Sequence, residues 1–228
     1  MTAPRYGFLR ADALSLAFGA LFLATLVGQA FAGAADHNAR QVSEGLPEVS
    51  LLDYVTSSSF GVDVMENWQS EYLQFLLYVF ATVWLVQRGS SESKEEGQEG
   101  TESDEEQQVG PHAGDESPPW ARTGGWRTAV FSRSLGLLMC VLFLLTWAAS
   151  SVAGWAAYNA EQLGQRQDPV SWVGYLGEAD FWNRSFQNWQ SEMLAVGSMA
   201  VFAVYLRQRG SPESKPVGAA HADTGQTG

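Results

Sequence analysis

Two long stretches without a charged residue limit what this chain can fold into more than any other feature. The first runs from Ala13 to Ala35 and the second from Ser134 to Ala160. A helix needs about 20 apolar residues to cross a hydrocarbon core of about 30 Å, and both stretches exceed that length. The sequence therefore predicts an all-α integral membrane protein.

Two shorter apolar runs, Tyr72–Gln87 and Met193–Leu206, each follow a nearly identical hexapeptide. The hexapeptide reads ENWQSE at 66–71 and QNWQSE at 187–192. Runs of this length also occur in buried helices of soluble proteins, but their pairing with the longer runs favours two further membrane spans. We therefore expect four transmembrane helices, at about 13–35, 67–87, 133–157 and 188–208.

An internal repeat joins these segments into two equivalent halves. Residues 14–94 align with 135–215 at a shift of 121 positions without a gap, and 31 of the 81 aligned positions are identical. Identity at this level indicates an internal duplication. Each half reads as a helix, a loop and a helix, so we expect two tandem helical hairpins of the same orientation, with pseudo-two-fold symmetry along the membrane normal.

The repeat also bears on the start of the chain. Arg5 and Arg10 before the first apolar run, with small residues after it, resemble a cleaved signal peptide. The equivalent run of the second half is internal and cannot be cleaved in this way. A retained membrane helix is therefore the simpler interpretation of both runs.

The expected organisation has five parts. They are an N-terminal segment at 1–11, a first hairpin at 12–90, an acidic linker at 91–128, a second hairpin at 129–211 and a tail at 212–228. The linker and tail contain too few apolar residues to form a core, so both are expected to be disordered.

The basic residues predict the orientation of the helices. Ten of the 13 Lys and Arg residues lie in the two terminal segments, in the linker or at the helix ends next to them, and only three lie in or beside the two loops. The excess of basic residues on the cytoplasmic side places both termini and the linker in the cytoplasm. The two loops, which carry Arg40, Arg166 and Arg184, then face outward.

Several classes of function are excluded or disfavoured. The net charge of −12 argues against nucleic-acid binding, which needs a cationic surface. Cys140 is the single cysteine and the three histidines are scattered, so no disulfide, metal site or cofactor site is expected. No nucleophile set or nucleotide-binding loop is present, and we expect no enzyme activity.

The hexapeptide predicts a polar cluster at the outer surface of each half. In the first copy Asn67, Ser70 and Glu71 lie at i, i+3 and i+4, on one face of a helix. We expect Glu71 in the first helical turn, where the helix dipole favours a carboxylate. The predicted cluster also includes a polar pair at the end of each long helix and comprises Asn38, Gln41, Asn67, Ser70, Glu71, Asn159, Gln162, Asn188, Ser191 and Glu192.

Three interpretations of this cluster remain open. The first is structural, with caps and interhelix hydrogen bonds that fix each hairpin. The second is a proton or cation site formed by Glu71 and Glu192 facing each other across the pseudo-axis, since a carboxylate near the bilayer is costly without a partner. The third is a docking surface for an envelope protein.

Several motifs resemble a known family. The pattern comprises Tyr158–Asn159, Gln162, Ser171, Tyr175–Leu176, Phe181–Trp182, the segment FQNWQSE at 186–192 and RQRGSPESK at 207–215. It is similar to a family of small bacterial integral membrane proteins known only as a domain of unknown function. The first half departs from the pattern where Gly61 and Met65 replace aromatic residues. The resemblance implies four helices and a location in the bacterial inner membrane, and it implies no activity.

These observations lead to two hypotheses of function. The first is a non-enzymatic structural or interaction protein of the cell envelope. The second is a small oligomeric transporter or channel that uses Glu71 and Glu192 as a proton or cation site. The expected partners are the lipid bilayer and either further copies of the chain or another envelope protein.

Overall fold

The structure, a computed structural model, describes residues 8–226 of the chain. Most of the expected N-terminal segment, at 1–7, and the last two residues of the tail lie outside the described residues. Within 8–226 all regular structure is helical and no strand occurs. The elements are α1 (Phe8–Ala11), α2 (Ala13–Ser43), α3 (Leu51–Val55), α4 (Ser58–Trp84), the 3-10 helix η1 (Gly110–His112), α5 (Pro119–Arg122), α6 (Gly125–Phe131), α7 (Ser134–Gly164), α8 (Trp172–Tyr175) and α9 (Ala179–Tyr205).

The two halves of the chain form the same helices at equivalent positions. Helices α2 and α7 each have 31 residues, and their bounds differ by the 121 positions found in the sequence. Helices α4 and α9 each have 27 residues and differ by the same shift. The short helices α3 and α8 begin after Ser50 and Ser171, whose side chains accept a hydrogen bond from the backbone three residues later.

The long helices extend beyond the apolar runs from which their bounds were predicted. Helix α4 begins at Ser58 rather than at 67, and α9 begins at Ala179 rather than at 188. The Ser57 side chain caps α4 by accepting from the Phe60 N–H at 3.3 Å, so the helix starts well before the apolar residues. Glu71 therefore lies inside α4 and not in its first turn, and the expected stabilisation by the helix dipole does not apply.

Among the described residues, two helices and not four are long and apolar enough to cross a membrane. These are α2 and α7. Helices α4 and α9 fall short because each carries charged residues in its first half, for example Glu66 and Glu71 in α4 and Arg184 and Glu192 in α9. By composition and length, the structure thus supports two of the four predicted spans.

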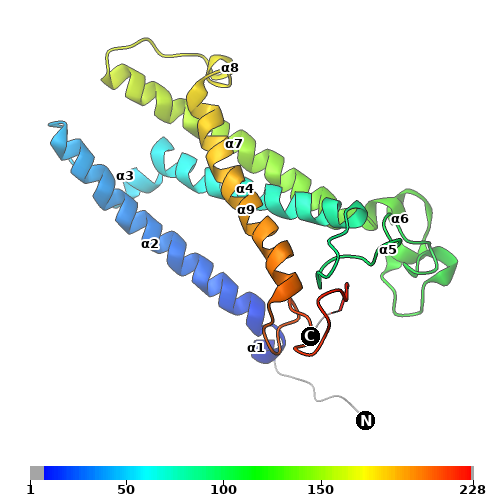
Figure 1. The fold of residues 1–228 in the computed structure, drawn as a ribbon. Helices are drawn as coiled ribbons and strands as arrows, with labels where there is room; N and C mark the ends of the chain where they lie inside the picture. The colour runs from blue at the N-terminus through cyan, green and yellow to red at the C-terminus, as the bar shows by residue number, and fades with distance from the viewer. Residues whose placement is uncertain (1–7, 227–228) are drawn as a thin grey trace.

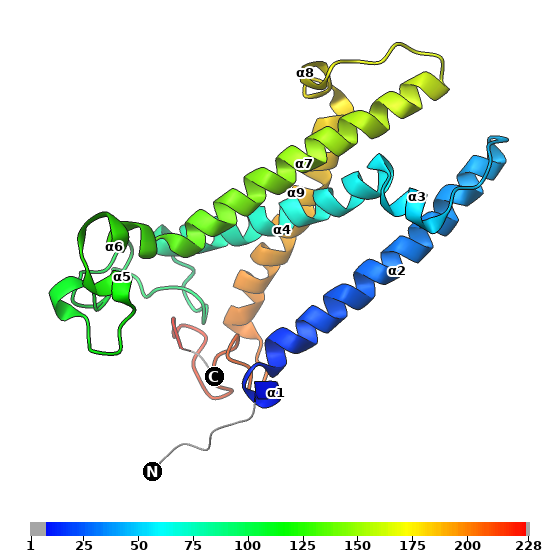
Figure 2. The ribbon, with the colours of Figure 1, turned by 180° about the vertical axis from the view of Figure 1, so that it is seen from behind.

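The most extensive packing joins the two halves, not the two helices of one hairpin. Helix α4 makes its largest contact with α7 and a second contact with α9 (Figures 1 and 2). Small residues permit the close approach of α4 and α7: a Cβ at Gly61 would lie 3.6 Å from the Ala153 Cβ, and one at Gly136 would lie 3.0 Å from the Phe80 ring. Close packing of helices through small residues is common in membrane proteins.

The second hairpin is closed by aromatic side chains. Trp147 of α7 lies 5.9 Å from Phe181 and 5.8 Å from Trp189 of α9, measured between ring centroids. Trp182 also contacts Trp147 edge-on at 6.2 Å. Aromatic pairs at these distances stabilise a contact beyond the area they bury.

The first hairpin is open and lacks most of these aromatic residues. Leu26, Gly61 and Met65 stand where the second half has Trp147, Trp182 and Phe186. The aromatic contact between α2 and α4 joins Phe22 and Trp68, at 5.9 Å. Helix α2 diverges from α4 toward the linker and tail, as α9 does from α7 (Figures 1 and 2), and α2 and α9 make no contact comparable to that of α4 and α7. In the described residues the halves therefore depart from two-fold symmetry.

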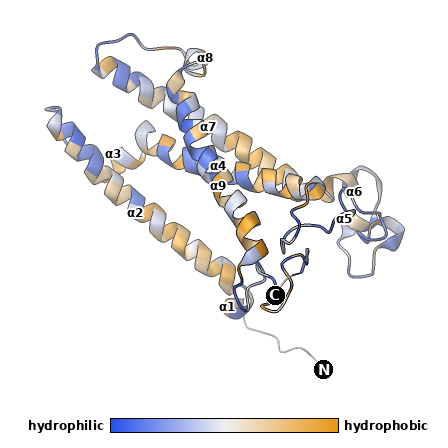
Figure 3. Ribbon diagram, viewed as in Figure 1, coloured by the Kyte–Doolittle hydropathy of each residue, from blue (hydrophilic) through white to orange (hydrophobic). Residues whose placement is uncertain are grey.

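The long helices share one polar end and one apolar end. The two loops at 44–50 and 165–171 lie at the polar end, whereas α1, the linker and the C-terminal tail lie at the other (Figure 1). The apolar lengths of α2, α4, α7 and α9 all lie toward the linker and tail (Figure 3). The polar length of each helix is thus the part that carries the predicted cluster.

The linker and tail, for which the sequence predicts no regular structure, consist of turns and short helical elements. The linker contains η1, α5 and the start of α6. In the tail, the Lys215 ammonium donates to the carbonyls of Ala220, His221 and Asp223. The tail also contacts the start of the linker, since the Ser91 hydroxyl donates to the Glu213 carbonyl at 3.2 Å.

Candidate functional site between the two halves

The asparagine of each long helix holds the following loop. The Asn38 side chain donates to the Val49 carbonyl at 3.0 Å and accepts from the Val49 N–H at 2.8 Å. Asn159 makes the same pair of bonds with Val170, both at 2.9 Å. Each asparagine therefore fixes the start of the short helix that follows.

A second repeated contact packs the short helix against the long one. A Cβ at Gly33 would lie 2.2 Å from the Tyr54 hydroxyl, and one at Gly154 would lie 2.6 Å from the Tyr175 hydroxyl. Both tyrosines are buried. The two glycines thus provide the space into which the tyrosines of α3 and α8 fit.

The hexapeptides form a polar contact between α4 and α9. The Trp189 indole N–H donates to Gln69 Oε1 at 2.8 Å, and the Ser70 hydroxyl donates to Glu192 Oε1 at 3.3 Å. Gln69 and Ser70 are each only 1% exposed. Hydrogen bonds of this kind link membrane helices when the alternative is an unpaired polar group.

The structure brings together some members of the predicted cluster and separates others. Ser70 and Glu192 contact each other, and Glu192 is the charged group whose field acts on Glu71. Asn67 and Asn188 donate instead to carbonyls of their own helices, at 2.7 and 2.9 Å. Ser191 does the same, at 2.8 Å.

The remaining members lie at the loop end of α2 and α7. The Gln41 amide lies 3.2 Å from His37 Nε2, on the same helix. Gln162 accepts from the Gln167 N–H through its backbone carbonyl. Within residues 8–226, no hydrogen bond links Asn38, Gln41, Asn159 or Gln162 to the hexapeptides.

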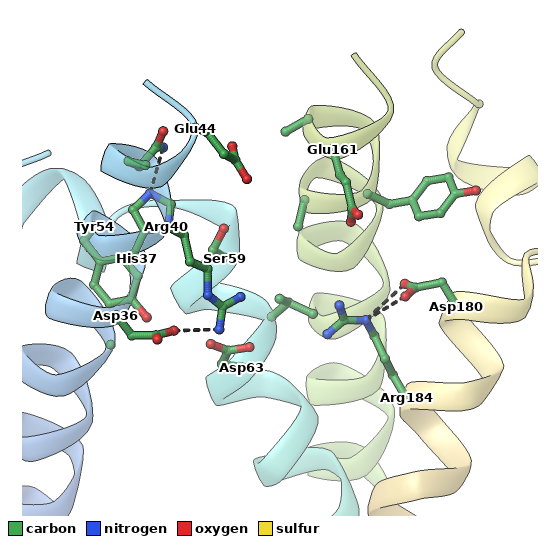
Figure 4. A pocket seen from close by; sticks show the side chains of 16 residues that line it. Asp36, His37, Arg40, Glu44, Tyr54, Ser59, Asp63, Glu161, Asp180 and Arg184 are labelled. Atoms are coloured by element: carbon green, nitrogen blue, oxygen red, sulfur yellow. Dashed lines mark hydrogen bonds and ion pairs between the residues drawn. The ribbon is translucent and has the colours of Figure 1, made fainter. Parts of the chain in front are cut away.

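An ion-pair cluster also joins the halves, nearer the loops. Arg184 of α9 contacts Glu66 Oε1 of α4 at 3.2 Å and Asp180 of its own helix at 3.0 Å (the Asp180 pair is drawn in Figure 4). The Tyr175 hydroxyl donates to the same Asp180 at 2.9 Å. The Glu66 side chain is 13% exposed and that of Arg184 is 38% exposed, so the pair between the halves is largely shielded from solvent.

Burial and charge act in opposite directions on the carboxylates of this cluster. Burial raises the pKa of Glu66, and the neighbouring Arg184 guanidinium opposes this rise. Burial also raises the pKa of Asp63, again against the influence of Arg184. Arg184 thus opposes the rise in the pKa of both carboxylates, and Arg40 adds to this effect at Asp63.

A cavity of about 360 Å³ opens beside this cluster, between the polar lengths of the four long helices. Five carboxylates and two arginines line it: Asp36, Glu44, Asp63, Glu161, Asp180, Arg40 and Arg184 (Figure 4). Each arginine is paired with a carboxylate, Arg40 with Asp36 at 2.6 Å and Arg184 with Asp180. The cavity is therefore acidic. In the described part of the chain, no group of three or more His, Cys, Asp and Glu side chains is placed to hold a metal ion.

The ion-pair cluster is absent from the sequence prediction because that prediction selected residues that are identical in the two halves. Arg184 occupies the position equivalent to Asp63, and Glu66 the position equivalent to Gln187. A search for opposite charges at equivalent positions would have found Asp63 with Arg184 and Arg40 with Glu161. Opposite charges at equivalent positions give the two similar halves surfaces of complementary charge.

The fold and the site together define an all-α protein of two similar halves, with two helices able to cross a membrane and a polar contact region between the halves. The chain belongs to the family described as Domain of unknown function (DUF6766), whose model matches residues 5–226. The match spans both halves and the linker, so the family's unit is nearly the whole chain. No curated protein and no solved structure matches the chain.

Proposed function

We propose that this protein is a non-enzymatic structural or interaction protein of the bacterial cell envelope, spanning the inner membrane four times. The observation that carries the proposal is that most of the repeated polar side chains bond to the chain itself. Asn38 and Asn159 hold the loops, and Gln69 and Ser70 hold α9 on α4. Side chains used in this way maintain a scaffold and are not free to act on a substrate.

The distribution of apolar residues supports membrane spans in α4 and α9 as well as in α2 and α7. The apolar lengths of all four helices lie at the same end of the molecule (Figure 3). Large apolar side chains there are exposed, for example Phe18 at 65%, Leu145 at 61% and Leu194 at 72%. Exposure of this extent is unfavourable in water and is expected for lipid-facing helices.

The proposed orientation follows from the basic residues, with both termini and the linker in the cytoplasm. The polar lengths of the helices then project outward and carry the acidic cavity. We propose that this outer end is where an envelope partner binds, through basic side chains that complement the cavity. Tandem duplication of one hairpin accounts for the two halves.

Labelling of single cysteines in intact cells tests this topology. In a Cys140→Ala background, Glu48→Cys in the first loop is expected to react with a membrane-impermeant maleimide. Ser103→Cys in the linker is expected to react only after the cells are opened. Reaction of the linker cysteine in intact cells, or recovery of the chain in the soluble fraction without detergent, would contradict the proposal.

A transporter or channel is the second candidate, and one observation favours it. Glu192 lies against Ser70, next to Glu71, so two carboxylates of the hexapeptides are neighbours near the membrane boundary. Under the structural proposal, vesicles containing the protein show no proton or cation flux above that of empty vesicles. A flux that disappears in Glu71→Gln with Glu192→Gln would instead establish the transport function.

A further inference from the structure

Each hexapeptide presents two opposite faces of its helix. Successive residues are rotated by about 100° around an α-helix, so residues three apart lie on one side. In α4, Trp68 and Glu71 share one face, while Gln69 and Ser70 point to the other side. In α9 the same residue types, at 189–192, form the same two faces. We refer to them as the Trp/Glu face and the Gln/Ser face.

The contact between α4 and α9 uses one face of each kind. The Trp/Glu face of α9, with Trp189 and Glu192, meets the Gln/Ser face of α4, with Gln69 and Ser70. The donors and acceptors match: the indole donates to the amide oxygen, and the hydroxyl donates to the carboxylate. The two kinds of face are therefore complementary.

One complementary pair of faces is left over. Within residues 8–226, no hydrogen bond is formed by the side chains of Trp68, Glu71 or Gln190, and Ser191 donates only to its own helix. Glu71, Gln190 and Ser191 are exposed, although Gln69 and Ser70, the equivalents of the last two, are buried. A cavity of about 660 Å³ between α2 and α4 opens onto Trp68 and Glu71.

The two remaining faces cannot meet within one chain. Helices α4 and α9 already touch through their other faces, so the Trp/Glu face of α4 and the Gln/Ser face of α9 point away from each other. At the membrane boundary an unpaired carboxylate and unpaired amide are unfavourable, which favours a contact that satisfies them. A partner with the right donors and acceptors must therefore come from another molecule.

We propose that this partner is a second copy of the chain. In the resulting assembly the Trp68 indole donates to the Gln190 amide oxygen of a second copy, and the Ser191 hydroxyl of that copy donates to the Glu71 carboxylate. Each chain offers one free face of each kind, on opposite sides of the pair formed by α4 and α9, so copies join head to tail, each binding one neighbour through α4 and another through α9. The open first hairpin is the feature that leaves the Trp/Glu face of α4 accessible.

Cross-linking of cysteine pairs in membranes tests the proposal, with the chain's own repeat as the matched control. In a Cys140→Ala background, the test pair is Glu71→Cys with Ser191→Cys. The control pair is Ser70→Cys with Glu192→Cys, whose positions touch within one chain. After treatment with a short bis-maleimide, the test pair is expected to give products of two or more times the chain's mass on a denaturing gel. The control pair is expected to stay at the mass of one chain.

Co-expression of two differently tagged chains shows whether a linked product contains two copies, without relying on its mobility on the gel. One chain carries only Glu71→Cys and the other only Ser191→Cys, so a linked product that bears both tags joins two copies. Absence of that product, while the control pair reacts within its chain, overturns the proposal. Trp68→Cys with Gln190→Cys provides a second test pair, which is judged by the same result.

The inference rests on the proposed membrane location, and the two fail in different ways. If the protein is recovered from the soluble fraction, the proposed function is wrong whatever the cross-links show. If the protein remains in the membrane and its control pair reacts but its test pairs do not, the proposed contact between copies alone is wrong.

Discussion

Replacing Arg184 with methionine is expected to lower the free energy of unfolding by about 2–3 kcal/mol, which is the cost typical of losing hydrogen bonds to a shielded charge. Methionine keeps much of the length of the side chain but leaves Glu66, whose side chain is 13% exposed, without its partner on α9. Thermal or denaturant unfolding of the purified protein in detergent measures the loss.

The equivalent change at Arg40 is the matched control. Arg40 forms a pair with Asp36 on one helix, but the two side chains are 75% and 63% exposed. Exposed ion pairs contribute about 0–1 kcal/mol, so Arg40→Met is expected to have little effect. Equal losses in the two variants would show that the pair between Arg184 and Glu66 does not hold the halves together.

The loss in Arg184→Met should depend on pH in a defined direction. Burial raises the pKa of Glu66, and removal of the arginine that opposes this shift raises it further. A carboxyl group with a raised pKa in the folded state stabilises the fold at low pH and loses that contribution as the pH rises through the folded pKa. The variant is therefore expected to be closer to wild type at about pH 5 than at about pH 8. Adding Glu66→Gln should remove most of this dependence.

Gly154→Ala is expected to destabilise the second half by about 1–2 kcal/mol, the net of overpacking and of the higher helix propensity of alanine. The new Cβ would lie 2.6 Å from the Tyr175 hydroxyl and 3.2 Å from the nearest ring carbon. Tyr175 is 1% exposed, and its hydroxyl is bonded to Asp180, so the ring cannot move without disturbing the ion-pair cluster. The same unfolding measurement detects the change.

Gly28→Ala serves as the control for this substitution. Gly28 also lies in a long apolar helix, but a Cβ there meets no atom within 4 Å. The change is expected to leave stability unchanged or to raise it by up to about 1 kcal/mol. A neutral Gly154→Ala variant would contradict the close packing of α7 against Tyr175.

The sequence predicts the helices of this fold better than their ends. Apolar runs and the repeat at 121 positions locate α2 and α7 and place α4 and α9 at equivalent positions. Hydropathy does not predict the polar parts of α4 and α9, because a helix can continue through polar residues as long as its backbone hydrogen bonds and caps are satisfied. The capping serine at 57 is the kind of signal that would have moved the start of α4 toward the observed residue.

The packing between helices was less predictable than the helices themselves. Two tandem hairpins suggest that α2 packs on α4, whereas the main contact joins α4 and α7. Gly61 lies against Ala153 of α7, whereas the equivalent Trp182 packs on Trp147 between α7 and α9. Comparing identical residues selects Ser70 and Glu192 of the hexapeptides, but the predicted cluster omits Gln69 and Trp189, and the comparison misses the charges in which the halves differ.

The ion pair between Arg184 and Glu66 has a consequence for how such a protein can be assembled. Subunits encoded by one unfused hairpin gene would carry the same residue at positions 63 and 184, and could place either two acids or two bases there. Covalent fusion lets each copy mutate on its own, so residue 184 can be an arginine that pairs with Glu66 while its equivalent in the first half, Asp63, is acidic. An artificial chain built from two first halves would lack the arginine, and its modules would have no means of recognising each other at this junction.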